Sequence, residues 1–134
     1  MVGIVIVTHG TMAEGMMDAA SMIVGDLEGV RAVELKEMDA VEDLMDRISA
    51  AVDEVDTGDG ALVFVDLFGA SPFNASARLL GAEKERNVEV ITGVNLPMVL
   101  EVAIQRSSKD LEALIEVAED AGTSGVKVLS RVLS

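Results

Sequence analysis

The sequence of 134 residues contains no cysteine, no tryptophan and no tyrosine, and it has a single histidine. Without cysteine there can be no disulfide framework, no thiolate metal site and no cysteine nucleophile. No window approaches the ~20 consecutive apolar residues that a membrane-spanning helix needs. The N-terminus also lacks the basic start and long apolar run of a signal peptide. These absences predict a cytoplasmic protein.

Motifs for cofactors are missing as well. With one histidine and no cysteine, only carboxylates remain as metal ligands, and they lack the spacing of a metal site, so no metal is predicted. No glycine-rich dinucleotide or Walker pattern is present, so no nucleotide cofactor is predicted either.

Basic residues are scarce. Ten Lys and Arg stand against 24 Asp and Glu, which gives a net charge of -14. This charge repels nucleic acid and anionic membranes, and it attracts a basic protein partner. The alternative is that the acidity only maintains solubility or reflects a salty cytoplasm, and both interpretations stay open.

Short runs of β-branched residues alternate with longer segments of helical periodicity along the chain. This alternation predicts an α/β fold: a single domain over 1–134, built as a three-layer sandwich around a mostly parallel, doubly wound sheet. Charges alternate through the second predicted strand, which places it nearer the sheet edge. The expected strands are 3–7, 30–35, 61–65, 88–92 and 126–133, and the expected helices are 13–24, 40–55, 72–80, 98–106 and 110–121.

Polar residues stand where several of these strands end. His9 and Gly10 follow the first strand, Asp66 follows the third, and Asn95 follows the fourth. Ligands of an open parallel sheet bind beyond the carboxyl ends of its strands. A lone histidine is more often structural than catalytic, but this position favours a functional role for His9.

A histidine in this position suits phosphoryl transfer. One ring nitrogen can attack while the other donates a hydrogen bond, and a carboxylate that accepts this bond orients the ring. Asp66 is the candidate carboxylate, and the alternative is a turn or cap aspartate. Ser71 is expected to cap a helix that begins at Pro72, where its hydroxyl and the first amides would meet phosphate. The amide of Gly10 is expected to be free for an anion, and Gly69 keeps the loop small enough for a second protein to approach.

Three segments carry a resemblance to a known family. They are IVIVTHG at 4–10, VDLFGASPFNA at 65–75 and ITGVNLPM at 91–98. In this order and spacing, the sequence resembles the IIA domain of the mannose, fructose and sorbose branch of the bacterial sugar phosphotransferase system (PTS). The similarity extends across nearly the whole chain.

The resemblance implies a role for each site residue. His9 would carry the phosphoryl group on its Nε2 (tele) nitrogen, Asp66 would orient it, and Ser71 would lie on the phosphate side. Gly10, Gly69 and Asn95 would contribute to phosphate or partner binding. No cofactor is implied.

The resemblance also implies partners. The group would come from the phosphocarrier protein HPr and pass to a IIB component, which phosphorylates the sugar delivered by the membrane subunits IIC and IID. The family forms homodimers in which the last strand adds antiparallel to the partner's sheet, a role that residues 126–129 fit. In some relatives a IIB domain follows on the same chain, and because this sequence ends at Ser134 a separate acceptor is expected.

Two other functions remain open at this point. The phosphotransferase subunit of dihydroxyacetone kinase shares the fold and a strand-end histidine, although its loop after the third strand usually differs. A regulatory IIA-like module would use the same His9 chemistry without feeding transport. The sugar is not predicted.

Overall fold

A parallel sheet of four strands forms the middle of the molecule. The computed structural model describes residues 1–83 and 85–134. In the sheet the strands have the order β2-β1-β3-β4, and all neighbours are parallel. Their bounds are β1 Gly3–His9, β2 Val30–Leu35, β3 Ala61–Val65 and β4 Val88–Ile91.

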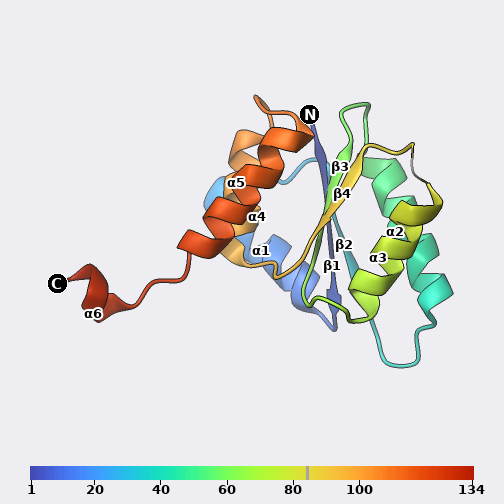
Figure 1. The fold of residues 1–134 in the computed structure, drawn as a ribbon, viewed down its shortest axis with the longest axis horizontal. Helices are drawn as coiled ribbons and strands as arrows, with labels where there is room; N and C mark the ends of the chain where they lie inside the picture. Colours follow the sequence, from blue (N-terminus) through green and yellow to red (C-terminus); the bar gives the residue numbers. More distant parts are fainter. Residues whose placement is uncertain (84) are drawn as a thin grey trace.

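Helices cover both faces of this sheet (Figure 1). The helices α1, α4 and α5 lie on one face, and α2 and α3 lie on the other, so the molecule has three layers. Their bounds are α1 Met12–Val24, α2 Val41–Val55, α3 Ser71–Ala82, α4 Leu96–Gln105, α5 Leu111–Ser124 and the short α6 Leu129–Val132. The predicted α/β three-layer fold with a parallel sheet is therefore confirmed.

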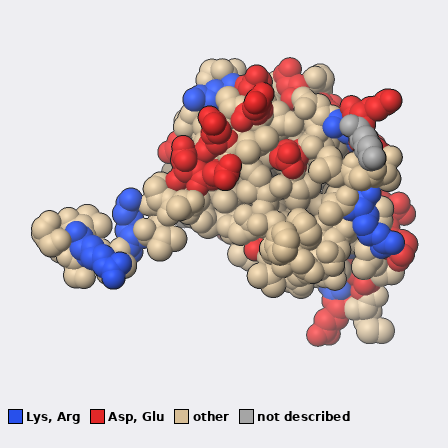
Figure 2. All heavy atoms as spheres, viewed as in Figure 1, with Lys and Arg blue, Asp and Glu red and all other residues tan. Residues whose placement is uncertain are grey.

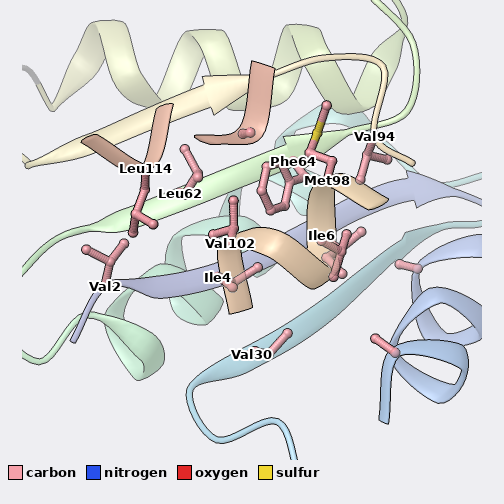
Figure 3. Close-up of a cluster of buried hydrophobic side chains, with 14 of the residues drawn as sticks. Val2, Ile4, Ile6, Val30, Leu62, Phe64, Val94, Met98, Val102 and Leu114 are labelled. Atoms are coloured by element: carbon pink, nitrogen blue, oxygen red, sulfur yellow. The ribbon is translucent and has the colours of Figure 1, made fainter. Parts of the chain in front are cut away.

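Each layer of helices buries its own apolar cluster against the sheet. On the α1–α4–α5 face, the side chains of Ile4, Ile6 and Phe64 pack against Val102 and Leu114 (Figure 3). On the opposite face, alternate residues of the same strands pack against α2 and α3. Burial on both faces explains why the central strands are continuous apolar runs rather than alternating ones.

The strand order places a topological switch between β1 and β3. From β1 the chain moves to one side of the sheet to form β2, and later moves to the other side of β1 to form β3 and β4. The carboxyl ends of β1 and β3 are neighbours, which is where ligands bind in open α/β sheets. The two edge strands are β2, as its alternating charges predict, and β4.

The C-terminal segment differs from the sequence prediction. Instead of a strand over 126–133, the single chain has an irregular stretch followed by the short helix α6, and this segment extends away from the three layers (Figure 1). A strand requires a neighbour to share its backbone hydrogen bonds. The described part of this chain offers the segment no such neighbour, so its apolar residues stay exposed.

Charge is unevenly distributed over the surface. Acidic side chains gather over the layer that contains α5, whereas the C-terminal segment presents basic ones (Figure 2). The basic residues of that segment are Lys127 and Arg131. None of the described helices combines the length and apolar composition that a membrane crossing requires.

Candidate active site

His9 and Asp66 meet at the switch between β1 and β3. The ring nitrogen Nδ1 of His9 lies 2.8 Å from Oδ2 of Asp66, and the backbone N–H of His9 donates to the same oxygen at 2.9 Å. The His9 side chain is 51% exposed, whereas that of Asp66 is 12% exposed. One partly buried carboxylate thus holds both the backbone and the ring of a histidine that faces solvent.

The protonation of Asp66 follows from its surroundings. Burial raises the pKa of this carboxyl, but hydrogen bonds from the His9 amide and ring, together with the charge of the ring, outweigh burial and lower the pKa below its usual value. An ionised carboxylate only accepts hydrogen bonds. In the neutral ring Nδ1 of His9 therefore bears the hydrogen, and Nε2 has a lone pair that can act as a nucleophile.

The turn after His9 is fixed by backbone contacts. Gly10 adopts a φ of +55°, which favours glycine, and its N–H donates to the carbonyl of Leu35 at 2.9 Å. The prediction that this amide is free for an anion is therefore wrong, because the neighbouring strand β2 uses it. Thr8 completes the turn, since its buried hydroxyl accepts the N–H of Ala13 at 2.8 Å, in the first turn of α1.

Helix α3 begins one residue earlier than the sequence predicts. Ala70 is the N-cap, because its carbonyl accepts the first helical hydrogen bond from Asn74 N–H at 2.9 Å. Ser71 is therefore the first helical residue and not the cap, and Pro72 takes the second position. The Ser71 hydroxyl makes no capping bond and stays available at the helix start.

The loop between β3 and α3 is open and small. Gly69 is exposed at a φ of +81°, and an added Cβ there would meet nothing within 4 Å. The rings of Phe68 and Phe73 pack at a tilt of 38°, with centroids 4.7 Å apart, on the side of the loop toward β4. The loop thus leaves room for a second molecule beside Asp66.

Asn95 has a structural position. Its side-chain oxygen caps α4 by accepting the N–H of Met98 at 3.1 Å, and its amide donates to the carbonyl of Gly122 in α5 at 2.9 Å. Both ends of the carboxamide are therefore occupied. Asn95 lines a groove of about 570 Å³ beside β4, and the residues that line this groove include neither His9 nor Asp66.

Comparisons with known proteins agree with this geometry. The family model described as PTS system fructose IIA component matches residues 3–119. The chain belongs to this family. It is a PTS IIA component of the mannose, sorbose and fructose group.

Two relatives illustrate the extent of the similarity. The mannose-specific EIIAB component of Escherichia coli is 37% identical over 96% of this chain, which spans only 39% of that protein. The sorbose-specific EIIA component of Lacticaseibacillus casei is 30% identical over 90% of this chain and 88% of the relative. Among solved structures, the phosphotransferase system component EIIA of Streptococcus agalactiae has a TM-score of 0.90 and 25% identity, covering 98% of this chain and 99% of that one.

The contact between His9 and Asp66 was predicted from the sequence, but two neighbouring contacts were not. The backbone N–H of His9 shares the Asp66 oxygen, and Thr8 ties the end of β1 to α1. A threonine at a buried strand end, five residues before a helical position, is the signal that could have pointed to the second contact.

Among the described residues, no three His, Asp or Glu side chains come together to hold a metal ion.

Proposed function

We propose that this chain is a phosphocarrier that accepts a phosphoryl group from phospho-HPr on Nε2 of His9 and passes it to a IIB component. The observation that supports this proposal most directly is the 2.8 Å contact between His9 Nδ1 and Asp66 Oδ2. This contact holds one ring nitrogen and leaves the other toward solvent, where a partner protein can reach it.

The transfer follows from this arrangement. The lone pair of Nε2 attacks the phosphorus atom, the bond from phosphorus to the donor nitrogen breaks, and its electron pair returns to the donor. The ring of His9 becomes positively charged as the new bond forms. The carboxylate of Asp66 stabilises this charge without moving, because it already accepts the Nδ1 hydrogen.

The start of α3 offers partners for the phosphoryl oxygens. The N–H groups of Ala70 and Asn74 already donate to backbone carbonyls, and Pro72 has none. The first-turn donors left for the phosphoryl oxygens are the amides of Ser71 and Phe73 and the Ser71 hydroxyl. Such donors, at the positive end of the helix dipole, favour an anion. In this proposal Gly10 and Gly69 lie on the surface that faces the partner protein, and Asn95 supports the edge of that surface.

The proposed setting is sugar uptake driven by phosphoenolpyruvate. Residues 1–134 act as one IIA domain in the cytoplasm, and the IIB acceptor serves membrane subunits IIC and IID for a sugar of the mannose, fructose or sorbose group. The matching family model and the names of the relatives support this setting.

We further propose that two copies pair through their C-terminal segments. The exposed apolar residues Val126, Val128 and Leu129 of one copy would add as an antiparallel strand to edge strand β4 of the other. The groove beside β4 supports this role, because it is lined by Glu89 and Glu119, whose charge complements Lys127.

The test of the phosphocarrier role uses the fact that His9 is the sole histidine. Incubation with phosphoenolpyruvate, enzyme I and HPr should give one acid-labile, base-stable phosphoryl group, and phosphorus NMR should place it on Nε2. His9→Ala should accept none while keeping its thermal unfolding within about 2 °C, because His9 is exposed. Label on His9→Ala, or on Nδ1 of the wild type, would overturn the proposal.

A further inference from the structure

The loop between α2 and β3 contains the only Asp–Gly pair of the sequence, Asp59–Gly60, and no asparagine is followed by glycine. An Asp–Gly pair can rearrange spontaneously, because glycine has no Cβ to obstruct the approach of its backbone nitrogen to the preceding carboxyl carbon. The loop lies at the amino edge of the sheet, since Ala61 begins β3 and pairs in register with Gly3 (Figure 1). His9 lies at the opposite, carboxyl edge.

The rearrangement needs only the two residues and water. The backbone nitrogen of Gly60 loses its proton and attacks Cγ of Asp59, water leaves, and a five-membered succinimide ring forms. Water then adds to one of the two ring carbonyl groups. Addition at Cγ restores aspartate, whereas addition at the main-chain carbonyl gives isoaspartate, in which the backbone runs through the former side chain. No net water is consumed, and no other reactant takes part.

The structure holds the attacking nitrogen. The N–H of Gly60 donates to Oδ1 of Asp56 at 3.0 Å, and the N–H of Gly58 donates to the same oxygen at 2.9 Å. A carboxylate that accepts this hydrogen bond opposes loss of the proton, because its negative charge disfavours a second negative charge on the nitrogen. Gly60 is buried, whereas the Asp59 side chain is 63% exposed and contacts the α-amino group of Met1 at 2.7 Å.

The peptide group between the two residues is held as well. The carbonyl of Asp59 accepts the side-chain amide of Asn87 at 3.3 Å, and the carbonyl of Gly60 accepts the N–H of Gly3 at 3.0 Å. Gly60 has a φ of +88°, and an added Cβ would lie only 2.4 Å from the carbonyl oxygen of Asn87. Isoaspartate lengthens the backbone by one atom, and there is no space for this atom beside Asn87.

We propose that Asp59 is a latent site of isoaspartate formation, which the carboxylate of Asp56 keeps unreactive in the folded protein. Asp56 is itself anchored, because it ends α2 and its N–H donates to the carbonyl of Val52 at 2.9 Å. The acceptor oxygen is therefore fixed by the helix and not by the loop that it protects. This role is independent of the phosphoryl transfer proposed for His9.

The experiment measures isoaspartate during incubation at 37 °C and neutral pH. Methyl transfer by an isoaspartyl methyltransferase gives the amount, and peptide mapping gives the position. A synthetic peptide of residues 55–62 provides the rate without the fold. Isoaspartate at Asp59 should form at least about tenfold more slowly in the wild-type protein than in the peptide, since a hydrogen bond to a charged group must be broken. Asp56→Ala should raise the rate in the protein about tenfold.

Asp110→Ala is the matched control, because it also removes a carboxylate that accepts a backbone N–H, that of Ala113 in α5. This variant should form isoaspartate at the wild-type rate. Combining Asp56→Ala with Asp59→Glu should abolish the product, because glutamate would have to close a less favourable six-membered ring. A wild-type rate equal to that of the peptide would overturn the inference. So would a wild-type rate in Asp56→Ala, or an equal rise in Asp110→Ala.

Discussion

Asp66 is the residue on which the proposed chemistry depends most. Replacing it by asparagine keeps the size of the side chain but removes the negative charge beside the ring of His9. A carboxylate that orients a catalytic histidine contributes on the order of a few kcal/mol to the transition state in related triads. We expect Asp66→Asn to slow transfer from HPr by at least about tenfold, measured in single-turnover experiments.

A second aspartate separates this catalytic effect from a loss of stability. The side chain of Asp110 caps α5 by accepting the N–H of Ala113 at 2.9 Å. Asp110→Ala should lower the free energy of unfolding by about 1 kcal/mol and leave the transfer rate unchanged. If Asp66→Asn behaves in the same way, with a normal rate and reduced stability, then Asp66 is only a structural residue.

At the residue scale, contacts that follow from the chemistry of a side chain could be predicted from the sequence, whereas contacts that depend on the path of the backbone could not. His9 and Asp66 could be predicted to meet because both end parallel strands. The amide of Gly10 could not be assigned, because its partner Leu35 is known only once β2 is placed beside β1. The start of α3 was missed by one residue because Ala70 caps through its backbone conformation, without a capping side chain.

At the scale of elements, Asn95 joins two helices. It caps α4 and donates to the carbonyl of Gly122 in α5. We expect Asn95→Ala to lower the free energy of unfolding by about 1–3 kcal/mol, measured by urea denaturation, because one cap and one interhelical hydrogen bond are lost. Asn95→Ser should recover part of this loss, since a serine oxygen can still cap the helix.

The same variants test the phosphate-binding role that the sequence predicted for Asn95. Because both ends of its carboxamide have structural partners, we expect transfer from HPr to stay within about twofold of wild type at temperatures where the variant is folded. A tenfold slower transfer in the well-folded Asn95→Ser protein would instead support the predicted phosphate-binding role of Asn95.

Most elements were predictable because each one buries its own face against the sheet. The strands over 30–35 and 61–65 match the prediction, because the order of apolar and polar residues in each segment determines its burial pattern. The segment 126–133 was predicted as a strand and forms α6 and an irregular stretch in the single chain. Strand formation there depends on a pairing edge, which local sequence does not specify.

At the scale of the whole molecule, the proposed dimer follows from two surfaces that have no partner among the described residues. Val126, Leu129 and Leu133 are exposed at the end of the chain, and β4 has an open edge. We expect wild-type protein to have the mass of a dimer in light scattering. Deletion of 126–134 should give a monomer, because it removes the strand that each copy lends to the other. A truncated protein that stays dimeric would rule out this arrangement.

Charge reversal provides a milder test of the same interface. Lys127→Glu combined with Arg131→Glu should weaken the dimer and make it more stable at high salt than at low salt, because the new charges would face Glu89 and Glu119 of the partner. Lys109→Glu, on the connection between α4 and α5, changes charge at an exposed site away from the segment and should leave the dimer intact.

The Asp66 oxygen that contacts both the amide and the ring of His9 also affects how the phosphoryl group is released in the proposed cycle. As long as Nδ1 keeps its hydrogen, the phosphorylated ring is a cation, and a cationic ring is a better leaving group than a neutral one. The contact that lets His9 accept the phosphoryl group therefore also shortens the time for which His9 holds it. In this proposal one hydrogen bond favours both the acceptance of the phosphoryl group by His9 and its release, so the phosphorylated form lasts only until an acceptor protein binds.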